Sequence, residues 1–388
     1  MMMQGHSKAK KPKPRNITKT KFHSYCIGSL AKGCQYCVKG RKLVLFVTGL
    51  CSRRCFYCPL SEQKSNKDVV YANEWPTSDI KNIIKEAELC SAHGAGITGG
   101  NPLARLERTL SYIKALKKHF GKNFHIHLYT LPELLTMEKA EKLHKAGLDE
   151  IRLHPDIINN RKWGNVKNIV GFSWDIGMEI PVIPGYEKQT LKLIDYMAPY
   201  IRFLNLNELE YSDTNSYSLT KLGFRTKDSI SYGIKGSEEL AFKLMEKLKD
   251  PKYRFKVHYC TAKLKDAVQL RNRIKLMAKK VAESFDAVTN EGILVRGAVY
   301  TKESFPSFGK QKSGTKSSIS KLNQLRKELI KKGIRKEMLK IDASKARLLS
   351  SKPIIQRNKS MIKSKGLVAA IVQEYPTYDS LIVELDRV

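Results

Sequence analysis

The sequence predicts an α/β fold built from serial strand–helix units around a parallel sheet. Short apolar, β-branched runs recur up to residue 210, and most are separated by amphipathic segments of helical period that stop at glycine. Right-handed crossovers between successive strands make such a sheet parallel, either open or closed into a barrel. Cysteine and glycine turns directly follow two of the strands, at the carboxyl ends where such sheets bind ligands.

The predicted elements follow one another in a regular order. The first strand, 43–48, leads into a cysteine-rich loop, and a helix capped by Ser78 and stopped by Gly94 comes next. A short strand then enters the turn Gly99–Gly100. The alternation continues with helices at 106–121 and 132–147 and strands at 124–130, 149–155, 177–185 and 200–210. These segments predict about six strands in one sheet.

Beyond residue 210 the sequence predicts an extension of this core and a C-terminal module. The expected elements are a helix at 237–248, a strand at 253–260, a long helix at 265–285, a hairpin at Asn290–Gly292, a linker at 302–316, a basic helical stretch at 317–350 and two strands joined at Tyr375–Pro376. We therefore divide the chain into a flexible basic arm (1–22), a cysteine-bearing segment (23–41), the core and its extension (42–300), and a module of basic linker, helix and small β structure (301–388).

Charge is concentrated at the two ends of the chain. The formal charge is +34, from 71 Lys and Arg against 37 Asp and Glu. Residues 1–23 carry seven basic and no acidic side chains, and residues 302–365 carry nineteen basic against four acidic ones. Basic flanks around a nearly balanced middle favour a polyanionic partner, RNA or DNA. The alternative is a lysine-rich solvated surface with no nucleic-acid role.

The sequence shows neither a membrane span nor a secretory signal. No apolar run reaches the eighteen or so residues that a span requires, and the basic N-terminus lacks an apolar segment. Eight cysteines in 388 residues are too few for a disulfide scaffold. We therefore expect a cytoplasmic protein with no membrane partner, whose clustered cysteines serve metal binding or catalysis.

Six of the eight cysteines lie within 33 residues, and three of them share one loop. In the stretch GLCSRRCFYCPLSEQ, Cys51, Cys55 and Cys58 directly follow a strand. Three thiolates can ligate three corners of an iron–sulfur cube, which leaves the fourth iron open for a small molecule. A zinc knuckle would instead use paired Cys-x2-Cys units or Cys/His pairs. The spacing therefore favours a [4Fe–4S] cluster that binds a ligand through its open iron.

This loop resembles the cluster motif of the radical S-adenosylmethionine (SAM) superfamily, and the resemblance spans residues 41–260. It implies a partial (βα)6 parallel barrel of radical SAM type, with a [4Fe–4S] cluster on Cys51, Cys55 and Cys58 and SAM chelated to the open iron. In that family one electron from the cluster cleaves SAM to methionine and a 5′-deoxyadenosyl radical, which abstracts hydrogen from a substrate. The resemblance also implies a ferredoxin- or flavodoxin-like one-electron reductant and places Tyr57 near the adenine.

The turn ITGGNP resembles the Gly-Gly-Glu-Pro turn of the same family, whose backbone contacts the SAM amino group. Here Gly99, Gly100, Asn101 and Pro102 follow the second strand. Glycine suits a chain that passes close to a ligand. Asn101 stands where Glu is common, which removes a charge and keeps hydrogen-bonding capacity. An ordinary loop is the alternative.

Polar side chains also end later strands of the predicted sheet. Tyr129, His154 and Asn205 fall at or near the carboxyl ends of three of them. Because these ends meet at one edge of the sheet, the three side chains could contact the SAM ribose or carboxylate, or the substrate. A role as hydrogen-bonded loop anchors is the alternative.

A second cysteine group precedes the barrel. Cys34 and Cys37 have a metal-ligand spacing, and Cys26 is a plausible third ligand. They could hold a second iron–sulfur cluster or a zinc ion, and reduced buried thiols are the alternative. The candidates for a fourth ligand are His23, His258 and Cys260.

The segments HYCTAKLKDAVQLRNR and TNEGILVRGAVY resemble a finer group, archaeal uncharacterised proteins related to pyruvate formate-lyase activating enzyme. We therefore expect a radical SAM enzyme and consider two kinds of substrate. One is RNA held by the basic flanks, and the other is a protein or small metabolite, as for an activating enzyme. The alternative from another class is a zinc-containing nucleic-acid-binding protein without radical chemistry.

Overall fold

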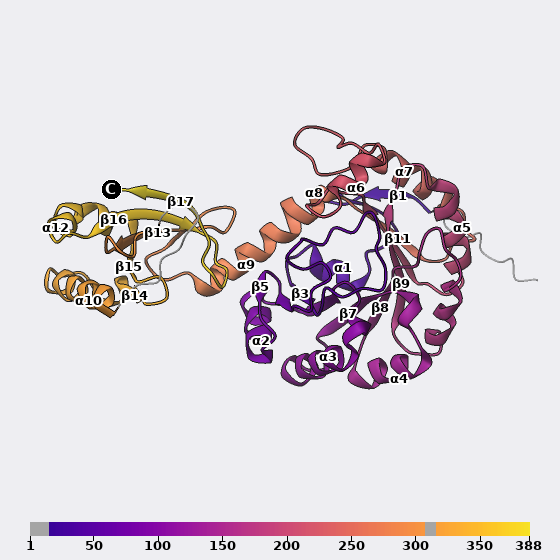
Figure 1. Ribbon diagram of the computed structural model, residues 1–388, viewed down its shortest axis with the longest axis horizontal. Coiled ribbons are helices and arrows are strands. Elements are labelled where there is room, and N and C mark those ends of the chain that lie inside the picture. Colours follow the sequence, from indigo (N-terminus) through magenta and orange to yellow (C-terminus); the bar gives the residue numbers. More distant parts are fainter. Residues whose placement is uncertain (1–14, 307–315) are drawn as a thin grey trace, which may run out of the picture. The chain divides into compact units, whose positions relative to one another are not determined.

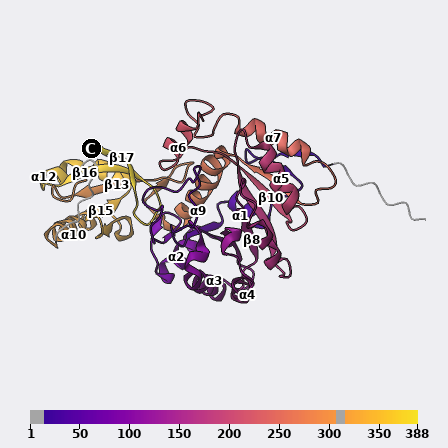
Figure 2. The same cartoon turned by 45° about the vertical axis from the view of Figure 1, so that its right-hand side comes forward.

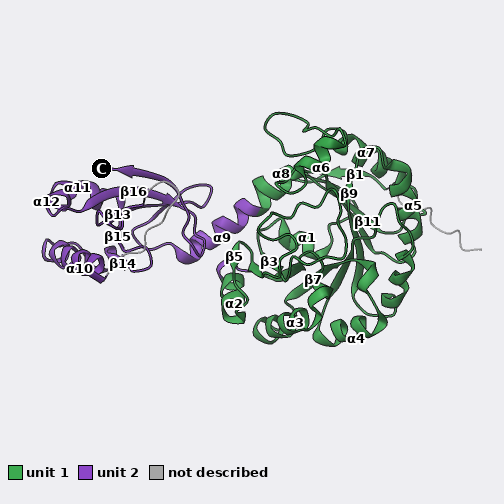
Figure 3. Cartoon of the chain, in the orientation of Figure 1, with its two compact units in different colours: residues 1–88, 92–269 green, residues 89–91, 270–388 purple. Residues whose placement is uncertain are grey.

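The computed structural model describes residues 15–306 and 316–388. The chain forms two compact units (Figure 3). Unit 1 contains the described residues through Glu88 together with Ala92–Gln269, and unit 2 contains Leu89–Ser91 and the described residues from Leu270 onward. The units thus divide after Gln269, and the sequence-based boundaries at residues 22, 41 and 300 stay predictions.

Unit 1 is built on one sheet in the order β1-β2-β11-β10-β9-β8-β7-β6-β3-β4-β5. Strands β3 and β6 to β11 are parallel to one another. The short strands β1, β2, β4 and β5 at the two edges pair antiparallel. The strands are β1 Ile17–Lys19, β2 Tyr25–Ile27, β3 Lys42–Phe46, β4 Tyr71–Ala72, β5 Trp75–Pro76, β6 Gly94–Thr98, β7 His125–Thr130, β8 Glu150–Leu153, β9 Asp175–Val182, β10 Phe203–Glu208 and β11 Lys256–Cys260.

Helices follow the strands and cover the outside of the curved sheet (Figure 1). They are α2 Ile80–Leu89, α3 Leu106–Phe120, α4 Met137–Ala146, α5 Glu187–Met197, α6 Ser216–Lys221, α7 Ser237–Lys247 and α8 Ala262–Leu264. Their buried apolar stripes recur at helical spacing, as with Leu110, Ile113 and Leu116 of α3. The partial parallel α/β barrel predicted from the sequence is therefore confirmed, and β11 adds a further parallel strand to the six of the prediction.

One short helix lies inside this barrel rather than outside it. Helix α1, Lys32–Cys37, contacts β3, β6 and β7, and Figures 1 and 2 both show it within the ring of strands. Gly33 allows the close approach, because a Cβ there would lie 2.6 Å from both Arg152 Nη2 and His127 Nδ1. The helix thus fills the end of the barrel lumen at which the strands begin.

The imidazole of His127 is enclosed between two glycines. A Cβ on Gly96 of β6 would lie 2.6 Å from His127 Nε2, and Gly33 of α1 approaches the opposite nitrogen. The ring is fully buried, and neither nitrogen has a hydrogen-bond partner. Burial, reinforced by the positive charges of Arg152 and Lys42, holds the pKa of His127 well below its usual value.

Unit 2 is a separate antiparallel sheet in the order β14-β15-β13-β16-β17, with β12 paired to β13. Helices α10 to α12 pack on one face, where Leu322, Leu325 and Leu329 of α10 meet Val299 and Leu348 of the sheet. The elements are α9 Arg271–Val281, β12 Ala287–Val288, β13 Leu294–Tyr300, α10 Lys316–Lys331, β14 Lys340–Asp342, β15 Arg347–Ser350, α11 Lys352–Arg357, α12 Lys359–Ser364, β16 Val368–Glu374 and β17 Ile382–Arg387.

Several elements differ from the sequence prediction. The helix predicted over 317–350 ends at Lys331, because Gly333 turns the chain at a φ of +90° and β14 and β15 follow. The helix predicted over 265–285 consists of two parts. Residues Lys265–Leu270 form a π-helical turn, and α9 follows over Arg271–Val281. Within the predicted flexible arm, Ile17–Lys19 form β1, because Ile17 packs on the unit 1 core and pairs with β2. The rest of that arm before residue 15, and residues 307–315 of the predicted linker, lie outside the described residues.

We predict that His127 makes unit 1 sensitive to acid. Its pKa is lowered from 6.5 in the folded state, so below pH 6.5 the unfolded chain binds a proton that the native chain does not. The free energy of unfolding therefore falls as the pH drops, by about 2 kcal/mol from this group at pH 5. The free energy of unfolding is measured with denaturant at pH 7.5 and at pH 5. Its decrease between these pH values should be about 2 kcal/mol smaller in His127→Gln than in wild type. The exposed His119→Gln is the control, and equal losses in both variants would contradict the prediction.

Candidate active site

The cysteine loop leaves the carboxyl end of β3 and is tied back on itself by backbone hydrogen bonds. Gly49 N–H donates to Lys67 O at 2.7 Å, Asn66 N–H donates to Gly49 O at 3.1 Å, and Cys58 N–H donates to Cys55 O at 3.1 Å. The thiols of Cys51, Cys55 and Cys58 are all half-buried. The loop thus presents three thiols from a single turn at the carboxyl edge of the sheet.

A partly buried ion pair attaches this loop to the segment that follows β7. Arg53 Nε donates to Glu133 Oε1 at 2.8 Å, and Glu133 belongs to the 3-10 turn Pro132–Leu134 after β7. Burial raises the pKa of the Cys55 and Cys58 thiols. A bound cation or Arg53 would favour their thiolate form, since an opposite charge stabilises an anion. This set of soft thiolate donors on one short loop fits an iron–sulfur cluster.

Within residues 15–306 and 316–388, no group of three or more His, Cys, Asp or Glu side chains has the arrangement of a metal site. This applies to Cys51, Cys55 and Cys58 and equally to the second cysteine group. The assignment of metal ligands therefore stays a prediction.

Tyr57 is held against the end of β8 by His154. The Tyr57 hydroxyl lies 3.2 Å from His154 Nε2, and His154 Nδ1 lies 2.8 Å from the backbone carbonyl of Glu179. A carbonyl only accepts, so Nδ1 carries the proton and Nε2 accepts from Tyr57. Burial lowers the pKa of His154, which favours this neutral form. The structure thus brings together two residues that the sequence predicts separately as cofactor contacts.

The Gly-Gly turn packs directly on the start of the cysteine loop. A Cβ on Gly99 would lie 2.3 Å from Thr48 O, and one on Gly100 would lie 2.5 Å from Leu50 O. Two hydrogen bonds join the segments, from Gly100 N–H to Thr48 O and from Asn101 N–H to Leu50 O, both at 2.8 Å. From the sequence, these glycines are expected to let the chain pass close to a ligand. The group that requires them here is the backbone of the loop.

Asn101 and Pro102 shape the turn that follows. Asn101 is fully buried, and its Oδ1 accepts from Leu103 N–H at 3.2 Å and from Thr130 Oγ1 at 2.9 Å. Pro102 opens the 3-10 turn Pro102–Arg105, which Asn101 caps. The Asn101 Nδ2 group is buried without a partner. The amide oxygen is therefore committed to the turn, and only Nδ2 is free to meet a further group.

A charged network crosses the lumen below the loop. Arg152 donates from Nε to Glu150 Oε1 at 2.6 Å and from Nη1 to Glu179 Oε2 at 2.9 Å. Nη1 also donates to the Tyr129 hydroxyl at 3.0 Å. Burying a charge is costly unless it is paired and hydrogen-bonded, and here the guanidinium has two carboxylate partners. Tyr129 thereby lies on the lumen wall, bonded to Arg152.

Glu179 is the centre of this network. Asn205 Nδ2 donates to its Oε2 at 2.7 Å, and Asn207 Nδ2 donates to its Oε1 at 3.1 Å. Burial alone would raise the pKa of Glu179, but Arg152 and the two amides outweigh it and the pKa is lowered. The carboxylate is thus ionised at neutral pH, and 17% of the side chain is exposed. Glu179 was not predicted from the sequence, although a single acid within an apolar strand is a signal for it.

The second cysteine group divides between two places. Cys34 is buried in the lumen, where its Sγ accepts from Asn205 Nδ2 at 3.3 Å, and Cys37 ends the same helix half-buried. Cys26 lies on β2, opposite His258 in register, and its thiol donates to Gly28 O at 3.2 Å. The α1 thiols therefore belong to the lumen network, and Cys26 has a partner of its own. A second cluster or zinc ion on these three cysteines stays a prediction.

Five side chains of the network around Glu179 and of its surroundings are half-buried rather than buried. They come from β7, β9, β10, β11 and α1. They are Tyr129, Glu179, Asn207, Cys260 and Cys37. These side chains provide a carboxylate, an amide, a phenol and two thiols. Such a set suits a polar organic group, because polar atoms there can replace the water they displace.

Comparisons with known proteins give the family. The radical SAM superfamily model matches residues 45–194. A Methanocaldococcus jannaschii protein named "Putative glycyl-radical enzyme activating enzyme" is 47% identical over 277 residues, which cover 69% of this chain and 73% of the relative. A second protein of that organism, named "Probable GTP 3′,8-cyclase", is 28% identical over 136 residues, 34% of this chain and 43% of its own.

A solved structure is also similar in part. The radical S-adenosylmethionine methyltransferase TsrM from Kitasatospora setae, with cobalamin and a [4Fe–4S] cluster bound, superposes with a TM-score of 0.37 and 13% identity over 63% of this chain and 54% of its own. From the family match and the M. jannaschii relative, the chain belongs to the radical SAM superfamily, and it is an enzyme that uses a [4Fe–4S] cluster to cleave SAM to a radical.

Proposed function

We propose that the cysteine loop holds the cluster and that the radical acts on a polar substrate bound in the lumen directly below it. Cys51, Cys55 and Cys58 are the proposed iron ligands. When bound, the cluster and SAM supply the 5′-deoxyadenosyl radical. The observation that carries the proposal is the ionised, partly exposed Glu179 carboxylate at the centre of the lumen network.

The chain's own residues have separate tasks in this proposal. The Gly99–Gly100 turn fixes the start of the loop through its two hydrogen bonds to Thr48 and Leu50. His154 orients the Tyr57 ring toward the lumen side of the loop, in keeping with a place beside the adenine. Tyr129 and Asn205, which the sequence predicts as cofactor contacts, hold the lumen network and are assigned here to the substrate side.

The substrate must enter from the end that carries the cysteine loop. Helix α1 fills the opposite end of the lumen and packs closely on His127 and Arg152. A small metabolite, or one side chain of a protein segment, can reach Glu179 from the open end. The name of the M. jannaschii relative supports an activating-enzyme-like role on a protein. We further propose a ferredoxin- or flavodoxin-like electron donor and a cytoplasmic location, where a reducing environment protects such a cluster.

RNA is the second candidate substrate, and the charge of unit 2 favours it. Exposed lysines follow one another on the helical face of this unit, among them Lys327 and Lys331 of α10 and Lys359 and Lys363 of α12. Such a surface could hold the phosphates of an RNA substrate. A zinc protein without radical chemistry, the alternative from another class, does not account for the family membership. Among the described residues, no helix has the length and apolar character to cross a membrane.

Replacing one proposed iron ligand should abolish SAM cleavage. The protein is reconstituted with iron and sulfide without oxygen, reduced with dithionite and given SAM. Wild type should form 5′-deoxyadenosine, and Cys55→Ala should form less than about 1% as much, because the open-iron cluster needs all three thiolates. The control is Cys90→Ala, which changes a buried thiol that follows α2. Equal 5′-deoxyadenosine from both variants would refute the ligand assignment.

Glu179→Gln should weaken the response to substrate. Fractions of a cell extract, separated into small molecules, protein and RNA, are added to the reduced enzyme and 5′-deoxyadenosine is measured. We expect the small-molecule or protein fraction to stimulate wild type, and the variant to need about tenfold more of it, because hydrogen bonds to charged groups contribute about 1.5–3 kcal/mol. Glu187→Gln on α5 is the surface control. An unchanged response in Glu179→Gln would exclude the carboxylate from substrate binding.

The RNA candidate predicts salt-dependent binding through unit 2. Affinity for bulk tRNA should fall steeply with salt, and Lys327→Ala/Lys331→Ala should reduce the slope by about 2, or about one for each phosphate that is no longer neutralised. Lys188→Ala/Lys192→Ala on α5 removes two exposed charges at the same spacing and should leave the slope unchanged. If wild type does not bind tRNA, or if nuclease treatment leaves the stimulating fraction fully active, the RNA candidate fails.

A further inference from the structure

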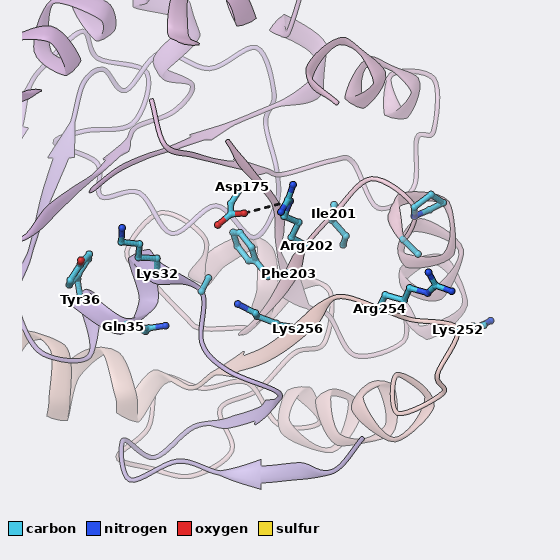
Figure 4. A pocket seen from close by; sticks show the side chains of 13 residues that line it. Lys32, Gln35, Tyr36, Asp175, Ile201, Arg202, Phe203, Lys252, Arg254 and Lys256 are labelled. Carbon is cyan, nitrogen blue, oxygen red and sulfur yellow. Dashed lines mark ion pairs between the residues drawn. The ribbon is translucent and has the colours of Figure 1, made fainter. Parts of the chain in front are cut away.

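Unit 1 contains a large cavity at the end of the barrel away from the cysteine loop. It has a volume of about 920 Å³ and is lined by 13 residues, which include the starts of β9, β10 and β11 and the outer side of α1 (Figure 4). The cysteine loop follows the carboxyl end of β3 in the same parallel sheet. The cavity and the loop therefore lie at opposite ends of the strands, so this cavity is not the SAM site.

The lining of the cavity is strongly basic. Five of its 13 side chains are Lys or Arg and one is Asp. Asp175 pairs with Arg202 at 3.6 Å, and both side chains are at least half exposed, which makes this pair weak. Lys252 pairs with Asp195, which is not part of the lining, at 3.3 Å.

Three of the cations have no acidic partner. Lys32 of α1, Arg254 before β11 and Lys256 at the start of β11 make no ion pair within the described part of the chain. Figure 4 shows these three side chains on separate segments among the residues that line the cavity. All three side chains are exposed, and three cations without acids of their own give the cavity a positive potential that attracts an anion.

We propose that this cavity is a second binding site, which takes a phosphorylated small molecule with at least two negative charges. An Arg fork and two Lys ammonium groups match phosphate oxygens, which accept bidentate and point-charge hydrogen bonds. The volume falls within the range of small-molecule pockets, about 300–1,000 Å³. A ligand of nucleoside diphosphate size fits this volume and carries the charges that the lining calls for.

The position of the cavity gives this site one wall in common with the lumen. Helix α1 presents Lys32, Gln35 and Tyr36 to the cavity, while Gly33 and Cys34 face Arg152 and Asn205. The phosphate ligand would therefore lie one helix thickness from the network around Glu179. Both sites are built from the same strands, one at their starts and one at their ends.

Calorimetric titration of the full chain tests the proposal, with binding as the readout rather than SAM cleavage. Pyrophosphate and ADP are the probes, and a short oligoribonucleotide is the second arm. We expect pyrophosphate and ADP to bind wild type at low salt and Arg254→Ala/Lys256→Ala to lose at least tenfold in affinity. Oligoribonucleotide binding should not depend on these two residues.

The matched control is Lys81→Ala/Lys85→Ala, which removes two exposed charges from α2 of the same unit. It should change the affinity for pyrophosphate less than twofold. Equal losses in the two variants would mean that net charge alone attracts the probes and would overturn the proposal. So would an absence of pyrophosphate and ADP binding by wild type, or a cavity-dependent affinity for the oligoribonucleotide alone. None of these outcomes bears on whether Cys55 is needed for SAM cleavage.

Discussion

The structure depends on the pairing of one half-buried carboxylate. Glu179 carries its charge in the barrel lumen only because Arg152, Asn205 and Asn207 donate to it from the two flanking strands. An isolated buried charge would cost several kcal/mol, so these contacts fix β8, β9 and β10 in one register. Cys34 receives the same amide of Asn205, which ties α1 to the network. A single group of hydrogen bonds thus fixes α1 and the strands β8, β9 and β10 around the lumen.

This group of bonds also reaches the cysteine loop. The backbone carbonyl of Glu179 accepts from His154, and His154 in turn accepts from Tyr57 of the loop. On the other side of the loop, Gly99 and Gly100 lie too close to its backbone for any side chain. The loop that carries Cys51, Cys55 and Cys58 is therefore held from both sides, and its position follows from the strands below it.

The sequence predicts the strands and the cysteine loop because both are local signals. Apolar runs mark β3 and β6 to β11, and three cysteines at a strand end mark the loop, whatever the rest of the chain does. The position of α1 could not be predicted, because the sequence of a six-residue helix with one glycine does not indicate which strands it packs against. The role of Glu179 could not be predicted, because it depends on a hydrogen bond from Asn205, which is 26 residues away in the sequence. The strands β14 and β15 were hidden by their length of three and four residues within a basic, helix-favouring stretch.

The cations at the two ends of the barrel differ in whether they have acidic partners. We use this difference to distinguish cations with a structural role from cations that could bind a ligand. Inside the lumen, Nε and Nη1 of Arg152 donate to two carboxylates and a phenol, so the fold itself supplies the acids that pair with this charge. At the other end, Lys32, Arg254 and Lys256 surround a hollow without an acid to pair with. These three side chains are exposed, and together they give the cavity a positive potential that attracts an anion. The cation in the lumen is therefore paired within the fold, whereas Lys32, Arg254 and Lys256 remain available to an anionic ligand.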